Sequence, residues 1–317
     1  MDHFKNFTNF LLEYQNKDIQ LIESLNNYFT IGFEIELNTT RRSYPIPPKI
    51  ITKESKLLKT PSIQDRKKIM DLKKNFPIFF RKYFDMFSFH YDETVSMGIE
   101  IVTTPFKNVD DAKEFLTIFF DEYNKQKDWF FDDKTSIHIN IGLNQKGKWK
   151  PLKGIILLSD DVIFKNIESR KISGFCKNIK NDLFYYLKSV DPEITKTYDI
   201  KKIENRLDYA IYDMSKSITE KTYGINLWKF YNSSNKYLEF RFIGGDVNLN
   251  ITLDKMLYFL YVVYLMTSKY KQKEYYNKLF IMVDKVRTKQ LDDIESLKKK
   301  DYKSVVKKQY KNKPIIP

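Results

Sequence analysis

Four short segments of the sequence alternate apolar and polar residues, and their polar positions hold groups that bind cations or phosphate. These positions are Glu34 and Glu36, Glu100, His138 and Asn140, and Glu239 and Arg241. In a strand, successive side chains point to opposite faces, so these groups would share one face and the Ile, Leu and Phe residues the other. A single strand of this kind needs no ligand, because many strands bury one face and solvate the other. The absence of lysine from all four polar faces, in a lysine-rich chain, favours a functional site.

Carboxylates that face each other across neighbouring strands repel, which would raise their pKa values or destabilise the sheet. A hard divalent cation removes that repulsion. Mg²⁺ prefers carboxylate oxygens and fills its remaining octahedral positions with water and substrate phosphates. Glu93, just before the strand expected over Met97–Thr104, can join the cluster from a loop. The pattern therefore predicts a carboxylate-lined sheet face that binds Mg²⁺ and a nucleotide.

Two residues of these segments have alternative roles. His138 is one of three histidines, and a lone histidine among isoleucines is more often structural or exposed than a ligand. The carboxylates expected on the neighbouring strands favour the ligand role. Arg241 is a candidate phosphate clamp, because a guanidinium grips phosphate oxygens with a fork of donors that lysine lacks. Its alternative role is an ion pair with Glu239 or a neighbouring glutamate.

The rest of the chain indicates which elements hold these residues. Alternation predicts strands over Phe29–Leu37, Met97–Thr104, Ser136–Leu143, Tyr223–Tyr231 and Tyr237–Ile243, with turn residues 232–235 joining the last two. A helical period predicts helices over Phe4–Tyr28 and Asp110–Gln126, within Val162–Ser217, and from Leu253 onward. Prolines within 44–48 require a loop, and the basic segment Lys53–Lys82 is expected to be a helical insertion. Strands and helices mixed without regular alternation favour an α+β fold.

Composition narrows the function classes. The chain has 317 residues, 42% of them hydrophobic, which is enough for a sizeable core. Cys176 is the only cysteine, which excludes an intramolecular disulfide and a thiolate zinc site and is typical of a reducing compartment. The longest apolar run, Met256–Met266, is far shorter than the roughly 20 residues of a spanning helix. We therefore expect it to be a buried core helix, and we expect no membrane partner.

Net charge identifies the kind of partner less sharply. Lys and Arg outnumber Asp and Glu by 55 to 41, a formal charge of +14, which suits an acidic substrate, a nucleotide or a nucleic acid. The sequence contains no Walker or Rossmann glycine fingerprint and no aromatic-basic motif of an RNA-binding sheet.

Taken in order, the motifs resemble the amidoligase family of the glutamine synthetase and glutamate–cysteine ligase superfamily. Gly32–Glu36 resembles the family's G-x-E-x-E strand, and Asp92–Pro105 its acidic turn followed by G-x-E-I-V-[ST]-P. Thr135–Gly142 is similar to T-G-x-H-x-H, Ile225–Leu227 to V-N-L, and Leu238–Arg241 to I-E-F-R. The resemblance extends over about 210 residues, from Gly32 to Arg241.

This resemblance implies a glutamine synthetase-like catalytic domain, with an antiparallel sheet and helices packed on one face. It spans 31–250, with an insertion at about 40–88, between an N-terminal helix (1–30) and a helical, lysine-rich C-terminal extension (251–317). By resemblance, one metal is held by Glu34, His138 and Glu239 and another by Glu36, Glu93 and Glu100. Arg241 would contact the transferred phosphoryl group, and Arg170 would bind substrate or phosphate. Asn140 and Lys221 stand where the family has nucleotide contacts, a histidine and an arginine respectively.

The implied activity is that of an ATP-dependent carboxylate–amine ligase that uses Mg²⁺ or Mn²⁺. A substrate carboxylate attacks the γ-phosphate to give an acyl phosphate, and an amine displaces the phosphate to form an amide. The carboxylate would belong to an acidic small molecule, peptide or protein. The many Lys, Asn, Ile, Tyr and Phe residues are typical of an AT-rich genome, such as that of a virus, a phage or a low-GC bacterium. We expect a cytoplasmic location, which would be the host cytoplasm for a virus or phage.

Two other functions stay open. Asn140, Lys221 and the unmatched extensions are compatible with a ligase fold that has lost turnover and serves as a structural or interaction protein, for example in a virus. The charge of +14, the segment 53–82 and the lysine-rich end are compatible with nucleic-acid binding. Solvated helix faces account for the same lysines, so nucleic acid is not the favoured partner.

Overall fold

The computed structural model describes residues 17–18, 20–40, 63–90, 98–159, 163, 176, 178–189, 194, 196–217, 223–232, 236–244 and 247–297. The expected site residues Glu93, Arg170 and Lys221 lie outside the described residues, as do the proline-rich loop at 44–48 and the last twenty positions. Residues 17–18 and 20–24 are helical, as expected for the end of the N-terminal helix.

One antiparallel sheet carries the expected site segments. Its strands are β1 (Phe29–Thr39), β2 (Phe87–His90), β3 (Ile99–Thr103), β4 (Trp129–Phe130), β5 (Ser136–Leu143), β6 (Ile225–Asn226) and β7 (Tyr237–Gly244). The order across the sheet is β2-β3-β1-β5-β7-β6, and β4 pairs separately with the end of β1. Every pairing is antiparallel. The mixed architecture with an antiparallel sheet that the sequence predicts is confirmed.

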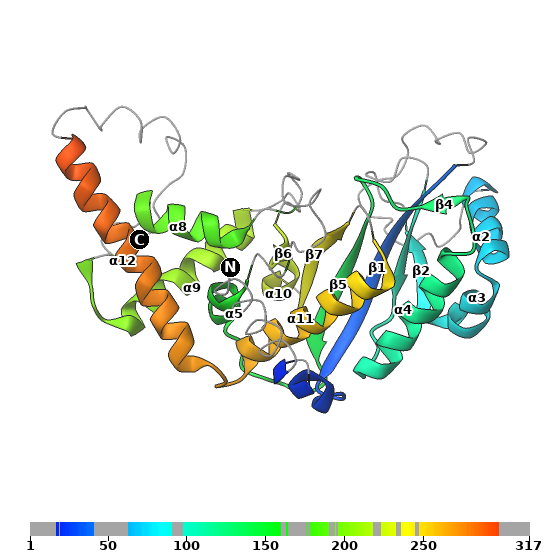
Figure 1. Ribbon diagram of the computed structural model, residues 1–317, viewed down its shortest axis with the longest axis horizontal. Coiled ribbons are helices and arrows are strands. Elements are labelled where there is room, and N and C mark those ends of the chain that lie inside the picture. The colour runs from blue at the N-terminus through cyan, green and yellow to red at the C-terminus, as the bar shows by residue number, and fades with distance from the viewer. Residues whose placement is uncertain are drawn as a thin grey trace, which may run out of the picture.

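The described helices lie mainly on one side of this sheet and beyond its edges (Figure 1). They are α2 (Ile63–Asn75), α3 (Pro77–Tyr83), α4 (Val109–Tyr123), α5 (Pro151–Leu157), α8 (Ile179–Ser189), α9 (Ile200–Ser217), α10 (Trp228–Asn232), α11 (Leu249–Thr267) and α12 (Gln272–Leu297). Helix α4 packs on β1, and α11 packs on β5 and β7. A single helical turn, η1 (Phe84–Met86), joins α3 to β2.

The apolar face of the sheet forms the core with α4 and α11. On this face the ring of Phe33 in β1 stacks on Phe115 of α4 at 5.4 Å, and Phe240 of β7 stacks on Phe259 of α11 at 4.5 Å. Among the described helices only α11 is long and apolar enough to cross a membrane, but 61% of its apolar window is buried in the protein. Core packing accounts for its composition, as expected for Met256–Met266.

The structure differs from the expectation for the strand Tyr223–Tyr231. Strand β6 contains only Ile225 and Asn226, and the chain then turns into α10. The Asn226 side chain accepts a hydrogen bond from the backbone N–H of Trp228 at 3.0 Å, which favours a helical turn over a continued strand. Strands β6 and β7 do pair, but α10 lies between them where a simple hairpin turn was expected.

The described part of the basic segment, residues 63–82, is mainly helical, as expected, but its end belongs to the main core. It forms α2 and α3, separated where Pro77 begins the second helix. Phe76, Phe79 and Phe80 are at most 1% exposed, and the Phe76 ring stacks on Phe119 of α4 at 5.6 Å. The short strands β2 and β4 were not predicted at all.

Candidate metal centre

The polar positions of β3, β1, β5 and β7 meet on the face of the sheet opposite α4 and α11. Strand register places Glu36 beside Glu100 and Glu34 beside His138. It also places Asn140 beside Glu239. Alternation along each strand therefore gathers the predicted groups in one place. We call Glu34, Glu36, Glu100, His138 and Glu239 the acidic face.

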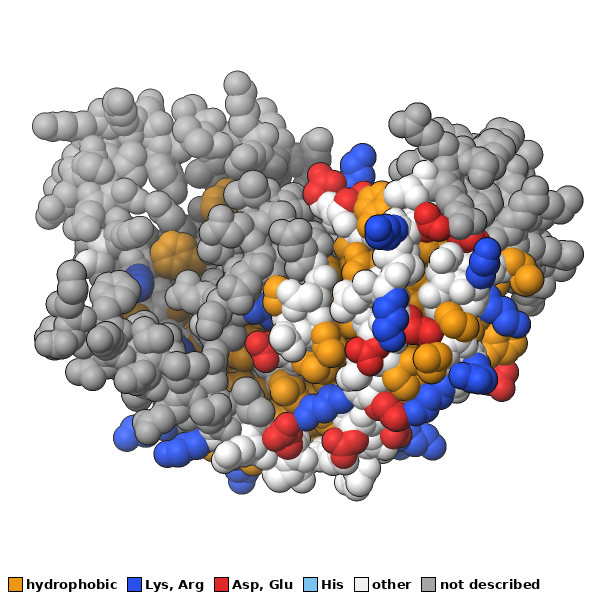
Figure 2. Space-filling model, turned by 45° about the vertical axis from the view of Figure 1, so that its right-hand side comes forward, with side chains coloured by type: hydrophobic (Ala, Val, Ile, Leu, Met, Phe, Trp, Pro, Cys, Tyr) orange, Lys and Arg blue, Asp and Glu red, His pale blue; other side chains and the backbone are white. Residues whose placement is uncertain are grey.

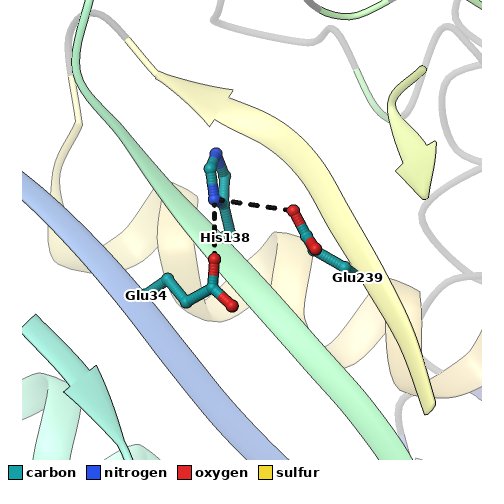
Figure 3. Close-up of side chains that lie close together, drawn as sticks. All are labelled: Glu34, His138 and Glu239. Carbon is teal, nitrogen blue, oxygen red and sulfur yellow. Dashed lines mark hydrogen bonds and ion pairs between the residues drawn. The ribbon is translucent and has the colours of Figure 1, made fainter. Parts of the chain in front are cut away.

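Glu34, His138 and Glu239 come from three adjacent strands and point toward one another (Figure 3). Each offers one ligand atom, and these atoms all lie within 4.8 Å of one another. His138 Nδ1 is 3.3 Å from Glu34 Oε2 and 3.8 Å from Glu239 Oε1. The three residues are only 6%, 2% and 0% exposed, in that order. Three donors that the sequence separates by about 200 positions are thus placed as one group able to hold a cation.

A second group shares the histidine. Glu36, Glu100 and His138 also offer ligand atoms within 4.8 Å of one another, and all three are buried. His138 Nε2 lies 3.9 Å from Glu36 Oε1. The Ser136 hydroxyl donates to Glu36 Oε2 at 2.5 Å and lies 2.7 Å from Nε2. The resemblance placed Glu93 with Glu36 and Glu100, and in the described residues His138 stands beside them.

Arg241 and Asn140 border the acidic face, and each has a buried atom without a hydrogen-bond partner among the described residues. Arg241 Nη1 donates to Glu239 Oε1 at 2.6 Å, which is the ion pair weighed as its alternative role. Its Nε is buried and unpartnered. Asn140 Nδ2 donates to Glu34 Oε1 at 2.9 Å, and its Oδ1 is unpartnered. Buried polar atoms normally have partners, so both atoms are suited to contact a bound molecule.

Sequence reasoning missed Lys229. Its Nζ lies 2.9 Å from Glu34 Oε1 and 3.1 Å from Glu239 Oε2, so it contacts both carboxylates of the first group. It belongs to α10, in the segment expected to be a strand. The four strands carry no lysine at their polar positions, but a neighbouring helix supplies one. The available signal was Asn226, because asparagine is often found where a helix starts, and Lys229 follows it closely.

Charges on this face fix the protonation of its members. Burial acts to raise the pKa of Glu34, but the hydrogen bond with His138 and the charge of Lys229 hold it well below its ordinary value. Burial and the charge of Glu34 act to raise the pKa of Glu239, yet the nearby His138, Lys229 and Arg241 lower it. Burial opposes the charge of Lys229, but the two carboxylates raise its pKa above the ordinary value. Both carboxylates are therefore ionised and the lysine is charged.

An open cavity of about 790 Å³ adjoins the acidic face at Glu34 and Asn140. Basic and aromatic side chains also line it: Lys146, Trp149, Lys236 and Tyr237. The cavity provides space for a ligand next to the groups that could hold a cation, and its lysines suit a ligand with negative charge.

Charges on the outer surface near α4 are balanced. Lys82 of the basic segment lies 2.6 Å from Glu114, and Lys113 lies 2.6 Å from Glu23. Figure 2, which brings the side of α4 forward, shows acidic and basic side chains interspersed there. This surface does not form a continuous basic stripe of the kind that binds a phosphate backbone.

No family model matches the chain, and no curated protein matches it. Among solved structures, the chain is similar to a cryo-EM structure of Plasmodium falciparum glutamine synthetase, with a TM-score of 0.38 and 14% identity over 78% of this chain and 54% of that chain. It is also similar to a crystal structure described as a novel glutamine synthase homolog, with a TM-score of 0.39 and 10% identity over 87% of this chain and 70% of that chain. The chain thus spans about half the length of the first structure. Likeness at these TM-scores is too weak to assign a fold family.

Proposed function

We propose that this chain is an ATP-dependent carboxylate–amine ligase that uses Mg²⁺ or Mn²⁺, with a glutamine synthetase-like, amidoligase-type catalytic domain over 31–250. The observation that carries the proposal is the acidic face itself: buried carboxylates from β1, β3 and β7 converge on His138, beside Arg241. Buried charges of one sign are costly unless they are paired or bind a cation.

The donors of the acidic face fit a divalent cation. Carboxylate oxygens suit Mg²⁺ and Mn²⁺, and an imidazole nitrogen is compatible with Mn²⁺. Glu36, Glu100 and His138 would hold such an ion. The group of Glu34, His138 and Glu239 has the same donor types but already contains the ammonium of Lys229. A bound divalent cation would neutralise phosphate charge during phosphoryl transfer, which is the main electrostatic requirement of that reaction.

The residues of the chain itself would bind and orient the reactants. The unpartnered Nε of Arg241 and the remaining guanidinium donors suit a phosphate oxygen, while Glu239 holds the other side of the group. Asn140 Oδ1 would accept a hydrogen bond from the nucleotide, next to the cavity that it lines. Arg170, Lys221 and Glu93 keep the roles in substrate, nucleotide and metal binding that the resemblance implies.

The cavity beside Glu34 would receive the carboxylate substrate near Lys146 and Lys236. This substrate would be an acidic small molecule, peptide or protein side chain. The amine must lose a proton before or during its attack. Lys229 does not serve as that base, because its raised pKa keeps it charged. These reactants fit a cytoplasmic enzyme.

ATP turnover tests the proposal. The purified chain is incubated with ATP, Mg²⁺, an amine and a panel of carboxylates, which are the acceptors of the phosphoryl group. ADP is measured with and without each carboxylate. We expect acceptor-dependent ADP formation that Glu239→Gln and His138→Ala abolish. Glu114→Gln, on exposed α4 surface, is the matched control and should retain full turnover. Turnover that survives both site variants would remove the acidic face from catalysis.

The other two functions are separate outcomes of the same preparation. Divalent-ion binding without ATP turnover on any acceptor would favour a ligase fold that has lost activity. Affinity for DNA or RNA that falls steeply with salt would favour nucleic-acid binding, and no affinity at low salt would exclude it.

A further inference from the structure

Lys229 lies against both of the carboxylates, Glu34 and Glu239, that a divalent ion beside His138 would need. Its Nζ contacts one oxygen from each carboxylate, Glu34 Oε1 at 2.9 Å and Glu239 Oε2 at 3.1 Å. The side chain is 22% exposed, while those of Glu34 and Glu239 are 8% and 0% exposed. The ammonium therefore bridges two buried carboxylates as a shared cation would.

The position of this ammonium is set by the protein backbone. Helix α10 starts at Trp228, whose N–H donates to the Asn226 side chain at 3.0 Å. The same Asn226 donates to Glu239 Oε2 at 3.1 Å, which ties the start of α10 to the acidic face. Phe230, the residue after Lys229, is 4% exposed, and its ring lies 5.2 Å from that of Trp149. Lys229 is thus held between an anchored helix start and a buried ring.

The ammonium of Lys229 and a divalent ion compete for the charge of the same two carboxylates. The oxygens nearest His138 Nδ1 are Glu34 Oε2 and Glu239 Oε1, and the latter already accepts a hydrogen bond from Arg241 at 2.6 Å. An ion bound there at about 2.0–2.1 Å would therefore lie on the same two carboxylates as the ammonium of Lys229. Two cations a few ångströms apart in a buried site also repel strongly. The charges are already matched without an ion, because Lys229 and Arg241 face Glu34 and Glu239.

We infer that Lys229 is a tethered cation that replaces a divalent ion between Glu34 and Glu239, so that this group binds no metal while Lys229 is in place. This inference rests on the proposed function, in which the acidic face binds a divalent ion. It differs from the two-metal site that the resemblance implies. The group of Glu36, Glu100 and His138 then binds the divalent ion. Lys229 supplies fixed positive charge on the other side of the histidine.

The stoichiometry of Mn²⁺ binding tests this inference. The electron paramagnetic resonance signal of free Mn²⁺ is lost on binding, so a titration counts bound ions per chain. We expect one ion for the wild-type chain and two for Lys229→Met. Lys236→Met is the matched control, because Lys236 lines the cavity beside Glu34 and its Nζ lies over the ring of Phe230, the residue after Lys229, at 5.2 Å. It removes the same charge, and its count should stay at the wild-type value.

Two further variants guard against loss of folding. Lys229→Gln is used if the methionine variant does not fold, because glutamine retains a hydrogen-bond donor for Glu34. It too should bind one more ion than wild type. Lys229→Arg retains the charge and should bind the wild-type number. Circular dichroism spectra recorded on each sample establish which variants are folded.

The count distinguishes failure of this inference from failure of the proposed function. Two ions on the wild-type chain, or no additional ion on a folded Lys229→Met or Lys229→Gln chain, would overturn the inference. The wild-type count alone is able to do so, whatever the variants do. No ion on wild type and one on Lys229→Met would uphold the role of Lys229 while removing Glu36, Glu100 and His138 as the metal site of the proposed ligase.

Discussion

Replacing Glu122 by glutamine tests how the basic segment is attached to the core. Glu122 lies near the end of α4 and is 5% exposed. Its carboxylate accepts hydrogen bonds from the backbone N–H groups of Ile78 at 2.9 Å and Phe79 at 2.7 Å. Helix α3 begins at Pro77 without a side-chain cap from its own preceding residue. A glutamate from another helix therefore caps α3.

The structure sets the expected magnitude. A hydrogen bond to a charged group stabilises a protein by about 1.5–3 kcal/mol, and a negative charge at a helix N-terminus adds about 0.3–1 kcal/mol. Glutamine retains one oxygen acceptor, but its NH₂ group would face the second backbone N–H. Glu122→Gln thus loses one charged hydrogen bond and the favourable charge. We expect the free energy of unfolding to fall by about 2–3 kcal/mol.

Urea denaturation followed by circular dichroism measures this change. The matched control is Glu114→Gln, the same substitution on the same helix, where the side chain is 54% exposed and pairs with Lys82. An exposed pair contributes little, so the control should lie within about 0.5 kcal/mol of wild type. Equal effects of the two substitutions would refute the docking of α3 through Glu122.

Three other outcomes are expected. Mn²⁺ at 100 times its Kd should raise the free energy of unfolding by about 2.7 kcal/mol, a gain that a chelator reverses in thermal scans; no shift at millimolar metal would contradict a metal site. Burial, reinforced by the charge of Glu204, raises the pKa of Asp208 to about 6, so stability should fall as the pH rises from about 4 to about 6. Asp208→Asn should reduce this dependence of stability on pH and raise the free energy of unfolding at pH 8 by about 1 kcal/mol. If urea titrations gave the variant the same pH dependence as wild type, the raised pKa of Asp208 would be contradicted. Gly224→Ala should destabilise the fold by about 1–3 kcal/mol, because its Cβ would overlap the buried Phe242 ring, whereas Gly32→Ala, whose nearest neighbour would lie at 3.5 Å, should cost less in the same unfolding assay.

The strands of the site could be predicted because their signal is local. A period of two residues sorts Glu34 and Glu36 from Phe33 and Ile35 without knowledge of any other strand. Which strands pair, and in what register, depends on the whole fold. The resemblance groups Glu34 with His138, but the register that sets them side by side, and the sharing of His138 between two carboxylate groups, became visible only in the structure.

Short elements account for most of what the sequence did not predict. Strand β4 has two residues and α10 has five, and neither is long enough to show a period. Lys229 was missed for that reason, since a strand over Tyr223–Tyr231 leaves no helix to bring it to Glu34 and Glu239. Phe76, Phe79 and Phe80 were assigned to an insertion because the surrounding lysines hid their contribution to the core.

The ring of His138 connects the two sides of the acidic face through a choice of tautomer. A neutral imidazole has one lone pair, so Nε2 can serve as a ligand on the Glu36 side only when the proton sits on Nδ1. Glu34, whose Oε2 lies 3.3 Å from Nδ1, is placed to accept a hydrogen bond from Nδ1–H in that tautomer. The carboxylate that contacts Lys229 thereby decides which nitrogen is available to an ion on the opposite edge of the ring.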